Sequence, residues 1–524
     1  MWRNFRLTAK ICQVITVRYS LVIISNKMKP MKTNKAQDRM GKRLYISVLI
    51  SSVLLGGCVN LNDKDLNSDL SSLDNLSYKQ SLQEIAAMDW PSDRWWERYG
   101  DPQLNALIEK ALNVSPSIKI AKARLAQAQG IAQQAGAVDD FQLGAGASAE
   151  MGKVSKLYKA YMPPSGWNDY GSITMDFSYD FDFWGKNRNL VAAATSDLAA
   201  AETESSAARL MLATSIANAY AELARLCDNQ NTVESALSVR QKTVELLQKR
   251  YDNGLETLGS VNHAIAIRAS IESELLGIKE KVALQKNAIA ALTGAGPDNA
   301  LMIQTPHIRL TKRFGLPSDL GIGFIGHRPD VTAARWRASA AADRVGVAKA
   351  QFYPDVSISG FLGTQAFGLD NLFDHGNSAG SVQPAIYLPI FTGGRLDGQL
   401  NAAQASYQLA VSNYDNTLTQ ALHQVADVVT SSRSIDAQID KMQEAVNAAN
   451  HALQIASNRY KGGLATYLEV LVAEESVLNN ERALVNLQSR VFGLDIALVH
   501  ALGGGFHTTA PSAKHASSQS SQSL

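Results

Sequence analysis

Between Ser172 and Phe183 the hydrophobic pattern of this chain has a period of two without exception. The apolar or aromatic set is Ile173, Met175, Phe177, Tyr179, Phe181 and Phe183, and the polar set is Ser172, Thr174, Asp176, Ser178, Asp180 and Asp182. A period of two places the two sets on opposite faces of a β-strand. One face suits lipid or a protein core, and the other, which carries three carboxylates, suits only water.

Directly after this strand the pattern predicts a very long helix. The segment Trp184-Gly185-Lys186-Asn187 interrupts the alternation, and from Arg188 the chain is rich in alanine and has no glycine or proline before Gly254. At 1.5 Å per residue, a helix over residues 188–250 would be roughly 95 Å long. A strand with one wet face that leads into such a helix is an unusual junction, and the chain contains it twice.

The two halves of the chain repeat one plan. We expect a first repeat over residues 101–300, with a β-hairpin at 141–183, a long helix at 188–250 and a return helix at 260–292. The second repeat, 301–506, would hold a helix at 330–350, a β-hairpin at 356–391, a long helix at 395–459 and a return helix at 469–502. Arg188 and Arg395 are 207 residues apart, and Arg250 and Arg459 are 209 apart. Such constant spacing indicates an internal duplication.

A secretory signal precedes these repeats. Lys42 and Arg43 come before the apolar stretch 44–54, which is the order of a signal peptide. The stretch ends in Leu55-Gly56-Gly57-Cys58, which resembles a bacterial lipobox. We therefore expect Cys58 to receive a lipid and to become the first mature residue. An ordinary signal with a chance cysteine is the alternative.

The remaining terminal segments follow from this interpretation. Residues 1–57 would be the signal together with a spurious upstream extension, because the signal pattern begins at Met40 and we expect translation to start there. Residues 58–100 would be a lipidated tether. The polar stretch 507–524 would be a disordered tail.

Charge and cysteine content exclude several classes of protein. The formal net charge of +2 includes residues 1–57, which hold 11 Lys/Arg and one acid, so the remaining chain has a charge of −8. An acidic chain without a basic block is not typical of nucleic-acid binding, and we expect no nucleic-acid partner. The three cysteines and nine histidines form neither a disulfide framework nor a metal-ligand motif. We expect no catalytic residues, no metal and no cofactor other than the lipid on Cys58.

Four strands with a lipid-facing side cannot complete a membrane structure by themselves. A small closed barrel needs about eight strands, and open sheet edges in lipid would leave backbone amides unpaired at several kcal/mol each. Several copies must therefore share one barrel. The long helices are rich in Ala, Asn, Gln and Ser, which suits a wall that is wet on one or both sides. A solvated coiled-coil stalk is the alternative for the helices.

A set of short motifs, in order along the chain, resembles one known family. The motifs are Trp95-Trp96 with Asp101 and Leu104, Phe183 to Arg188, Arg328-Pro329-Asp330, Phe352-Tyr353-Pro354, Phe391-Thr392-Gly393-Gly394-Arg395 and Leu502-Gly503-Gly504-Gly505. Together with the lipobox they are similar to the outer-membrane efflux proteins, the TolC/OprM-like outer-membrane factors, and to their NodT-type lipoprotein branch. The resemblance covers residues 58–506.

This resemblance implies a fold and a set of partners. The fold would be mainly α with a β membrane part, in which a homotrimer shares a 12-stranded outer-membrane β-barrel above a barrel of long periplasmic helical hairpins. The partners would be a periplasmic adaptor and an inner-membrane pump, with outer-membrane lipid around the strands. Val59 after Cys58, where lipoproteins kept in the inner membrane typically carry Asp, favours the outer membrane, with the helices reaching into the periplasm.

The same resemblance implies a gate and adaptor contact at the two helical turns. The residues carried over are Arg250, Tyr251, Gly254 and Leu255 in the first copy, and Arg459, Tyr460, Gly463, Leu464, Leu468 and Glu469 in the second. Ser260 stands where the first copy would need an acid, which predicts a lopsided gate and a larger role for Leu468. The alternative is that the glycines only form hairpin turns and Tyr460 only packs.

Two further groups of residues have predicted roles. Asp176, Asp180 and Asp182 should line the lumen and favour cations. The alternative is a solvated face without that consequence. Bends from strand to helix are expected at Gly185, Gly393 and Gly394.

The function expected from these features is passive export. The chain would be a duct for small toxic compounds or drugs, working with an adaptor and a pump of the resistance-nodulation-division type. The absence of a nucleotide-binding motif in the sequence means that partners would supply the energy. A channel for type I protein secretion and a structural envelope lipoprotein are the alternatives.

Overall fold

The computed structural model describes residues 70–71, 77, 80, 89–155, 166–308, 315–317 and 320–508. The chain divides into two units, 1–65 and 66–524, and all described residues belong to the second. The predicted signal, the lipid site at Cys58 and the predicted tail beyond residue 508 therefore lie outside the described residues, as does most of the predicted tether.

Four strands form one antiparallel sheet in the order β1-β2-β3-β4. The strands are β1 (Gln142–Val154), β2 (Gly166–Phe181), β3 (Asp355–Phe367) and β4 (Ser378–Tyr387). The register aligns the period-two patterns of all four strands. Phe177, for example, lies opposite Leu143 on one side and Gly360 on the other, and Gly360 lies opposite Val382. One face of the sheet is therefore apolar across every strand, while the other carries Asp176 and Ser178.

The second β-hairpin is shorter than the predicted range 356–391. β4 ends at Tyr387, and residues 388–394 form no strand. Pro389 lies in this segment, and its lack of a backbone N–H prevents it from donating a ladder hydrogen bond. The apolar alternation of the sequence continues past the point where pairing stops, which explains why the prediction was too long.

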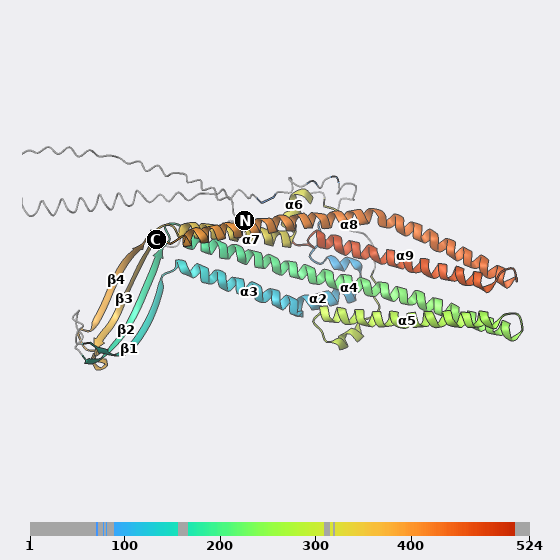
Figure 1. The fold of residues 1–524 in the computed structure, drawn as a ribbon, viewed down its shortest axis with the longest axis horizontal. Helices are drawn as coiled ribbons and strands as arrows, with labels where there is room; N and C mark the ends of the chain where they lie inside the picture. Colours follow the sequence, from blue (N-terminus) through green and yellow to red (C-terminus); the bar gives the residue numbers. More distant parts are fainter. Residues whose placement is uncertain are drawn as a thin grey trace, which may run out of the picture. The chain divides into compact units, whose positions relative to one another are not determined.

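Two helical hairpins follow the two β-hairpins. The first consists of α4 (Lys186–Asp252) and α5 (Leu258–Leu292), and the second of α8 (Arg395–Lys461) and α9 (Tyr467–Ala501). Each long helix has 67 residues, which corresponds to about 100 Å. Figure 1 shows the sheet beyond the N-terminal ends of α4 and α8 and the two hairpin turns at their opposite ends. The hairpins contact each other chiefly through α4 and α9.

Shorter elements complete the same plan in each half. The first half contains η2 (Trp95–Tyr99), α2 (Pro102–Val114), α3 (Pro116–Gly136), η3 (Ala137–Asp139) and η4 (Pro297–Met302). The second contains α6 (Leu320–His327), α7 (Pro329–Ala350) and η5 (Leu369–Asn371). In both halves a pair of helices precedes the β-hairpin and a pair follows it. Both α3 and α7 pack against α4.

A buried carboxylate fixes the first helices to the middle of α4. Asp101 caps α2 by accepting hydrogen bonds from the backbone N–H groups of Gln103 and Leu104. Its second oxygen accepts from the hydroxyl of Tyr220 at 2.8 Å and from the N–H of His307 at 2.9 Å. Since a buried carboxylate is costly unless it is hydrogen-bonded, these four donors make Asp101 an anchor of the fold.

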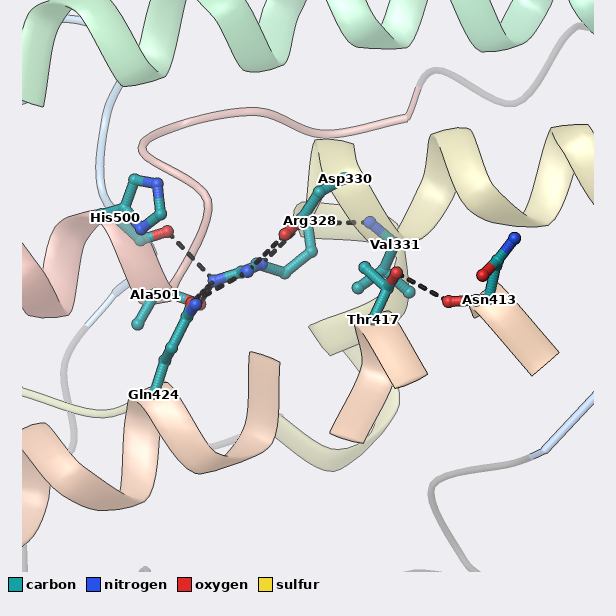
Figure 2. Close-up of polar contacts among 8 residues, drawn as sticks. All are labelled: Arg328, Asp330, Val331, Asn413, Thr417, Gln424, His500 and Ala501. Atoms are coloured by element: carbon teal, nitrogen blue, oxygen red, sulfur yellow. Dashed lines mark hydrogen bonds and ion pairs between the residues drawn. The ribbon is translucent and has the colours of Figure 1, made fainter. Parts of the chain in front are cut away.

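A buried arginine fixes the far end of α9 (Figure 2). Arg328, just before α7, donates to the backbone carbonyls of His500 at 3.3 Å and Ala501 at 2.9 Å. The same guanidinium forms a two-pronged ion pair with Asp330 and donates to Gln424 of α8. Carbonyls at a helix C-terminus have no partner within the helix. The backbone N–H of Gly503 also donates to the carbonyl of His500, so Arg328 chiefly satisfies that of Ala501 and joins α7, α8 and α9.

None of the described helices combines the length and the apolar character that crossing a membrane would require.

Candidate functional site

The candidate site comprises the two hairpin turns, and each turn is built by the same local rule. Gly254 and Gly463 have positive φ angles of 71° and 73°, which suit glycine because it lacks a Cβ. The next residue donates its N–H back across the turn, from Leu255 to the carbonyl of Arg250 and from Leu464 to that of Arg459, both at 2.8 Å. This pattern is the Schellman ending of a helix, and it explains why glycine followed by leucine stands at the same place in both Arg-Tyr-x-x-Gly-Leu sequences.

Both return helices begin earlier than predicted. In α5 the hydroxyl of Thr257 accepts from the N–H of Ser260 at 3.1 Å, so the helix begins at Leu258 rather than at 260. In α9 the cap is Thr466, and Glu469 is the third helical residue, so the helix begins at Tyr467 rather than at 469. The signal Thr-x-x-Glu was present in the sequence and would have placed this boundary correctly.

Side chains from both hairpins meet just behind the turns in one buried cluster, which we call the tip cluster. Its members are Leu247, Val261, Ala264, Tyr460, Tyr467, Val470 and Leu471. They come from α4, α5, α8 and α9, so the two turns are packed together. Burial of apolar surface stabilises this arrangement by about 25 cal/mol per Å² removed from water.

Tyr460 is the polar centre of the tip cluster. The side chain is 7% exposed, and its hydroxyl donates to Glu256 at 3.1 Å. The guanidinium of Arg250 lies 5.0 Å from the centre of the Tyr460 ring, within range of a cation–π interaction. Burial and the hydrogen bond to Glu256 raise the pKa of Tyr460 to about 12. The second hairpin is therefore held to the first by a neutral, hydrogen-bonded tyrosine.

Glu256 remains a carboxylate in this position. Burial acts to raise its pKa, but hydrogen bonds from the N–H of Thr257, the hydroxyl of Ser260 and Tyr460 outweigh burial, and the charge of Arg250 adds to them. The pKa of Glu256 is consequently lowered. An ionised acceptor strengthens the hydrogen bond from Tyr460.

Glu256 changes the prediction of a lopsided gate. The resemblance to the efflux proteins implies an acid six residues after Gly254, where this chain has Ser260. In the structure the acid is Glu256, two residues after that glycine. Ser260 donates its backbone N–H to the capping residue Thr257 and its hydroxyl to Glu256. Nothing in the local sequence indicates this role, because the partner Tyr460 is 204 residues away.

The second turn also has an ion pair, but within its own hairpin. Arg459 contacts Glu469 at 3.0 Å and donates to the carbonyl of Leu464 at 3.2 Å. Both side chains of the pair are about half exposed, so the pair contributes at most roughly 1 kcal/mol. This contact stiffens the turn without joining the two hairpins.

The remaining predicted tip residues are exposed in the single chain. Leu255, Leu464 and Leu468 are all more than half exposed, with Leu464 at 75%. Tyr251 is 39% exposed, although it occupies the same place in the first turn as buried Tyr460 does in the second. These four side chains are free to meet another chain, and the predicted constriction at Leu468 stays a prediction.

The predicted lumen residues separate into two groups. Asp176 and Asp180 lie on the polar face of β2. Asp182 lies beyond the end of that strand, where it accepts the backbone N–H of Arg188 at 2.9 Å and lies 3.5 Å from its guanidinium. Contrary to its predicted place on the strand, Asp182 occupies the junction and satisfies a free donor in the first turn of α4.

Three glycines stand at the two strand–helix junctions. Gly185 precedes α4 with a φ of 75°, and Gly393 and Gly394 precede α8 with φ angles of 59° and 82°. A positive φ turns the chain sharply and disfavours any side chain. At the first junction Trp184 donates to the carbonyl of Pro354 at 2.8 Å and stacks on Tyr353, which joins the two repeats at this level.

Known proteins match this chain over most of its length. The sequence model of a family described as "Outer membrane efflux protein" matches residues 107–295 and 324–504, once in each repeat. "Multidrug resistance outer membrane protein MdtP" of Shigella flexneri is 28% identical over 481 residues, which cover 89% of this chain and 97% of that protein.

Solved structures agree with the fold. The outer membrane protein VceC of Vibrio cholerae is 66% identical and superposes with a TM-score of 0.76 over 80% of this chain and 100% of that one. The outer-membrane channel OprN is 25% identical and superposes with a TM-score of 0.74 over 81% of this chain and 97% of that one. The predicted combination of long helical hairpins with a small antiparallel sheet is thus confirmed.

Proposed function

Because the chain belongs to the outer membrane efflux protein family, we propose that it is the outer-membrane channel of a tripartite multidrug efflux system. The observation that carries this proposal is the family match in each repeat, together with a tip where Tyr460 of the second hairpin contacts Glu256 and Arg250 of the first. The chain would act as a passive duct without catalysis, and its cargo would be small toxic molecules or drugs.

The proposed assembly is a homotrimer. β1 and β4 are the two edges of the sheet, and no other described strand pairs with the outer side of either one. In lipid such edges cost several kcal/mol per unpaired group, so pairing of β4 with β1 of another copy would remove the cost. Three copies would supply twelve strands, and the apolar face of the sheet would then meet lipid.

The proposed mechanism has a closed tip that opens when partners bind. In the single chain, Tyr460 joins the second hairpin to Glu256 and Arg250 of the first. An adaptor that contacts the exposed Leu255 and Leu464 could move one hairpin away from the other and break this link. A pump in the inner membrane, of the resistance-nodulation-division type, would supply the energy.

Membrane attachment through Cys58 is a further part of the proposal. The lipobox sequence before Cys58 supports it, together with the outer-membrane location of the family. We expect Cys58→Ser to lose labelling by a radioactive fatty acid while the trimer still assembles. Equal labelling of the variant and the unchanged protein would contradict lipid attachment at this residue.

Deletion and reconstitution test the function itself. A deletion strain should become more susceptible to several unrelated drugs, and the purified protein should give channels in planar bilayers. Restored resistance from a plasmid copy would complete the test. Unchanged susceptibility with no conductance would contradict the proposal, and a secreted polypeptide missing from the medium would indicate type I secretion instead.

A further inference from the structure

A buried ion pair joins the two helical hairpins farther from their turns than Tyr460. Arg240 of α4 contacts Glu474 of α9, and their side chains are only 6% and 11% exposed. Arg240 precedes Arg250 by ten residues, which places it roughly 15 Å farther from the turn along α4. Burial raises the pKa of Glu474, while the charge and hydrogen bond of Arg240 oppose this.

The pair lies between two apolar clusters at the contact between the hairpins. On the side of the turns is the tip cluster, which includes Leu247 and Leu471. On the other side is a second cluster made of Val233, Ile271, Leu275 and Ile278, with Leu478 packed against it. Along α4 the order is Val233, Arg240, Leu247, and along α9 it is Leu471, Glu474, Leu478. The charges are therefore enclosed by apolar side chains on both sides.

Tyr467 connects the pair to the network around Tyr460. Burial and the nearby charge of Glu474 raise the pKa of Tyr467. The ring of Tyr467 packs edge-on against that of Tyr460, with 5.7 Å between their centres. A displacement of the tip would thus reach Tyr467 through its ring contact with Tyr460, and the ion pair through the hydrogen bond between Tyr467 and Arg240.

We propose that Arg240 and Glu474 form a second latch, behind the tip, which holds α9 against α4 in the closed channel and separates when the channel opens. This proposal rests on the channel function proposed above and assigns two positioning residues to its gating. The latch works by burial. In the closed state the charges satisfy each other, and in the open state water solvates each of them.

The burial of both charges makes a specific prediction about single and double substitutions. Removing one charge leaves the other buried and without an ionic partner, which destabilises the closed state. Removing both charges and replacing them by apolar side chains leaves nothing to solvate, so the closed state recovers. If the pair is a latch, each single variant should increase the open probability of the channel, and the double variant should lower it again.

Planar-bilayer recordings of the purified full-length assembly test this pattern. We expect Glu474→Gln and Arg240→Met to raise the open probability about tenfold, and the double variant Arg240→Met/Glu474→Met to return it to that of the unchanged protein. The matched control is Glu444→Gln on α8, whose partner Lys441 is exposed and on the same helix, and it should change nothing. Unchanged open probability in both single variants would overturn the proposal.

A reversible cross-link tests whether the two positions separate on opening, even where a single charge variant does not assemble. Cysteines replace Arg240 and Glu474 in a chain that also carries Cys227→Ala and the tip variant Tyr460→Phe, which removes the hydrogen bond to Glu256. A short bifunctional thiosulfonate should lower the conductance of this protein about fivefold or more, and a thiol should restore it. No effect of the bridge means that α4 and α9 stay together at this level, and the latch is then wrong.

The unchanged protein separates this inference from the proposed function. If it forms no channels and restores no drug resistance, the channel function has failed. If it does both while the latch variants and the bridge have no effect, only the second latch has failed.

Discussion

At the scale of single residues, the two repeats use equivalent tyrosines differently. Tyr251 and Tyr460 follow an arginine at the same place in two turns of the same geometry. Only Tyr460 is buried, because Glu256 and Arg250 of the other hairpin surround it. A duplicated motif thus produces one anchoring tyrosine and one exposed tyrosine, and the difference arises from the neighbouring hairpin.

The raised pKa of Tyr460 predicts that alkaline solution opens the channel. The closed tip holds the phenol proton up to a pKa of about 12, whereas a tyrosine released into water has its ordinary value of 10.0. Between these two pH values the open form loses the proton first, so the stability of the closed tip is complete below pH 10 and decreases as the pH rises toward 12. Bilayer conductance should increase over this range.

The variant Tyr460→Phe controls for other groups that titrate at high pH. It lacks the hydroxyl, so its conductance should start higher and should lose most of the rise between pH 10 and 12. If the variant keeps the full rise, another group is responsible.

At the scale of elements, α9 is fixed at both ends by different means. Near the tip, Glu469 reaches back to the N–H of Thr466 at 3.4 Å, in the first turn of the helix. At the far end, Arg328 donates hydrogen bonds to the carbonyls of His500 and Ala501. The contacts of Arg328 are buried and join three helices, so they contribute more to stability than the exposed contact between Glu469 and Thr466.

Replacing Arg328 should destabilise the protein markedly. We expect Arg328→Met to lower the free energy of unfolding by about 2–4 kcal/mol, since it removes the guanidinium that donates to the Ala501 carbonyl and leaves Asp330 and Gln424 without their shared partner. Thermal unfolding in detergent, followed by circular dichroism, measures this. The control Arg337→Gln breaks ion pairs with Asp197 and Glu204 in which the Arg337 side chain is 48% exposed, and it should cost less than about 1 kcal/mol. Equal losses in the two variants would contradict an anchoring role.

At the scale of the whole described unit, the sheet register determines what a channel could present to its cargo. Asp176 lies in a row with Gly144, Phe361 and Ser381, and Asp180 lies opposite Ser357, so this face of the sheet is mainly polar but includes one aromatic side chain. Three copies would bring six such carboxylates onto one surface. Asp182 is not part of this row, since it serves the start of α4.

This division predicts different effects for the three aspartates. Asp176→Asn with Asp180→Asn should lower the preference for cations over anions, measured as the reversal potential in a salt gradient across a planar bilayer. Asp182→Asn should leave the reversal potential unchanged and lower thermal stability by about 1 kcal/mol, because an ionised partner at the start of a helix is lost. A shift of the reversal potential by Asp182→Asn alone would place that side chain in the ion path after all.

The sequence by itself determined the features that depend on neighbouring residues. A period of two is visible in consecutive side chains, and a long stretch without glycine or proline favours a continuous helix through local propensity alone. Gly254 and Gly463 end their helices through contacts within six residues. The duplication was visible for the same reason, since each copy repeats its own local signals.

Only the tertiary structure decided which of these residues meet across the hairpins. Glu256 reaches Tyr460 over 204 residues and Arg240 reaches Glu474 over 234, and no local pattern marks either pair. Asp182 has the period-two spacing of the strand, yet its carboxylate accepts a hydrogen bond from the backbone N–H of Arg188 in α4. The burial and the partners of a side chain depend on how separate helices pack. The same Arg-Tyr motif therefore has a buried tyrosine that joins the hairpins in one repeat and an exposed tyrosine in the other.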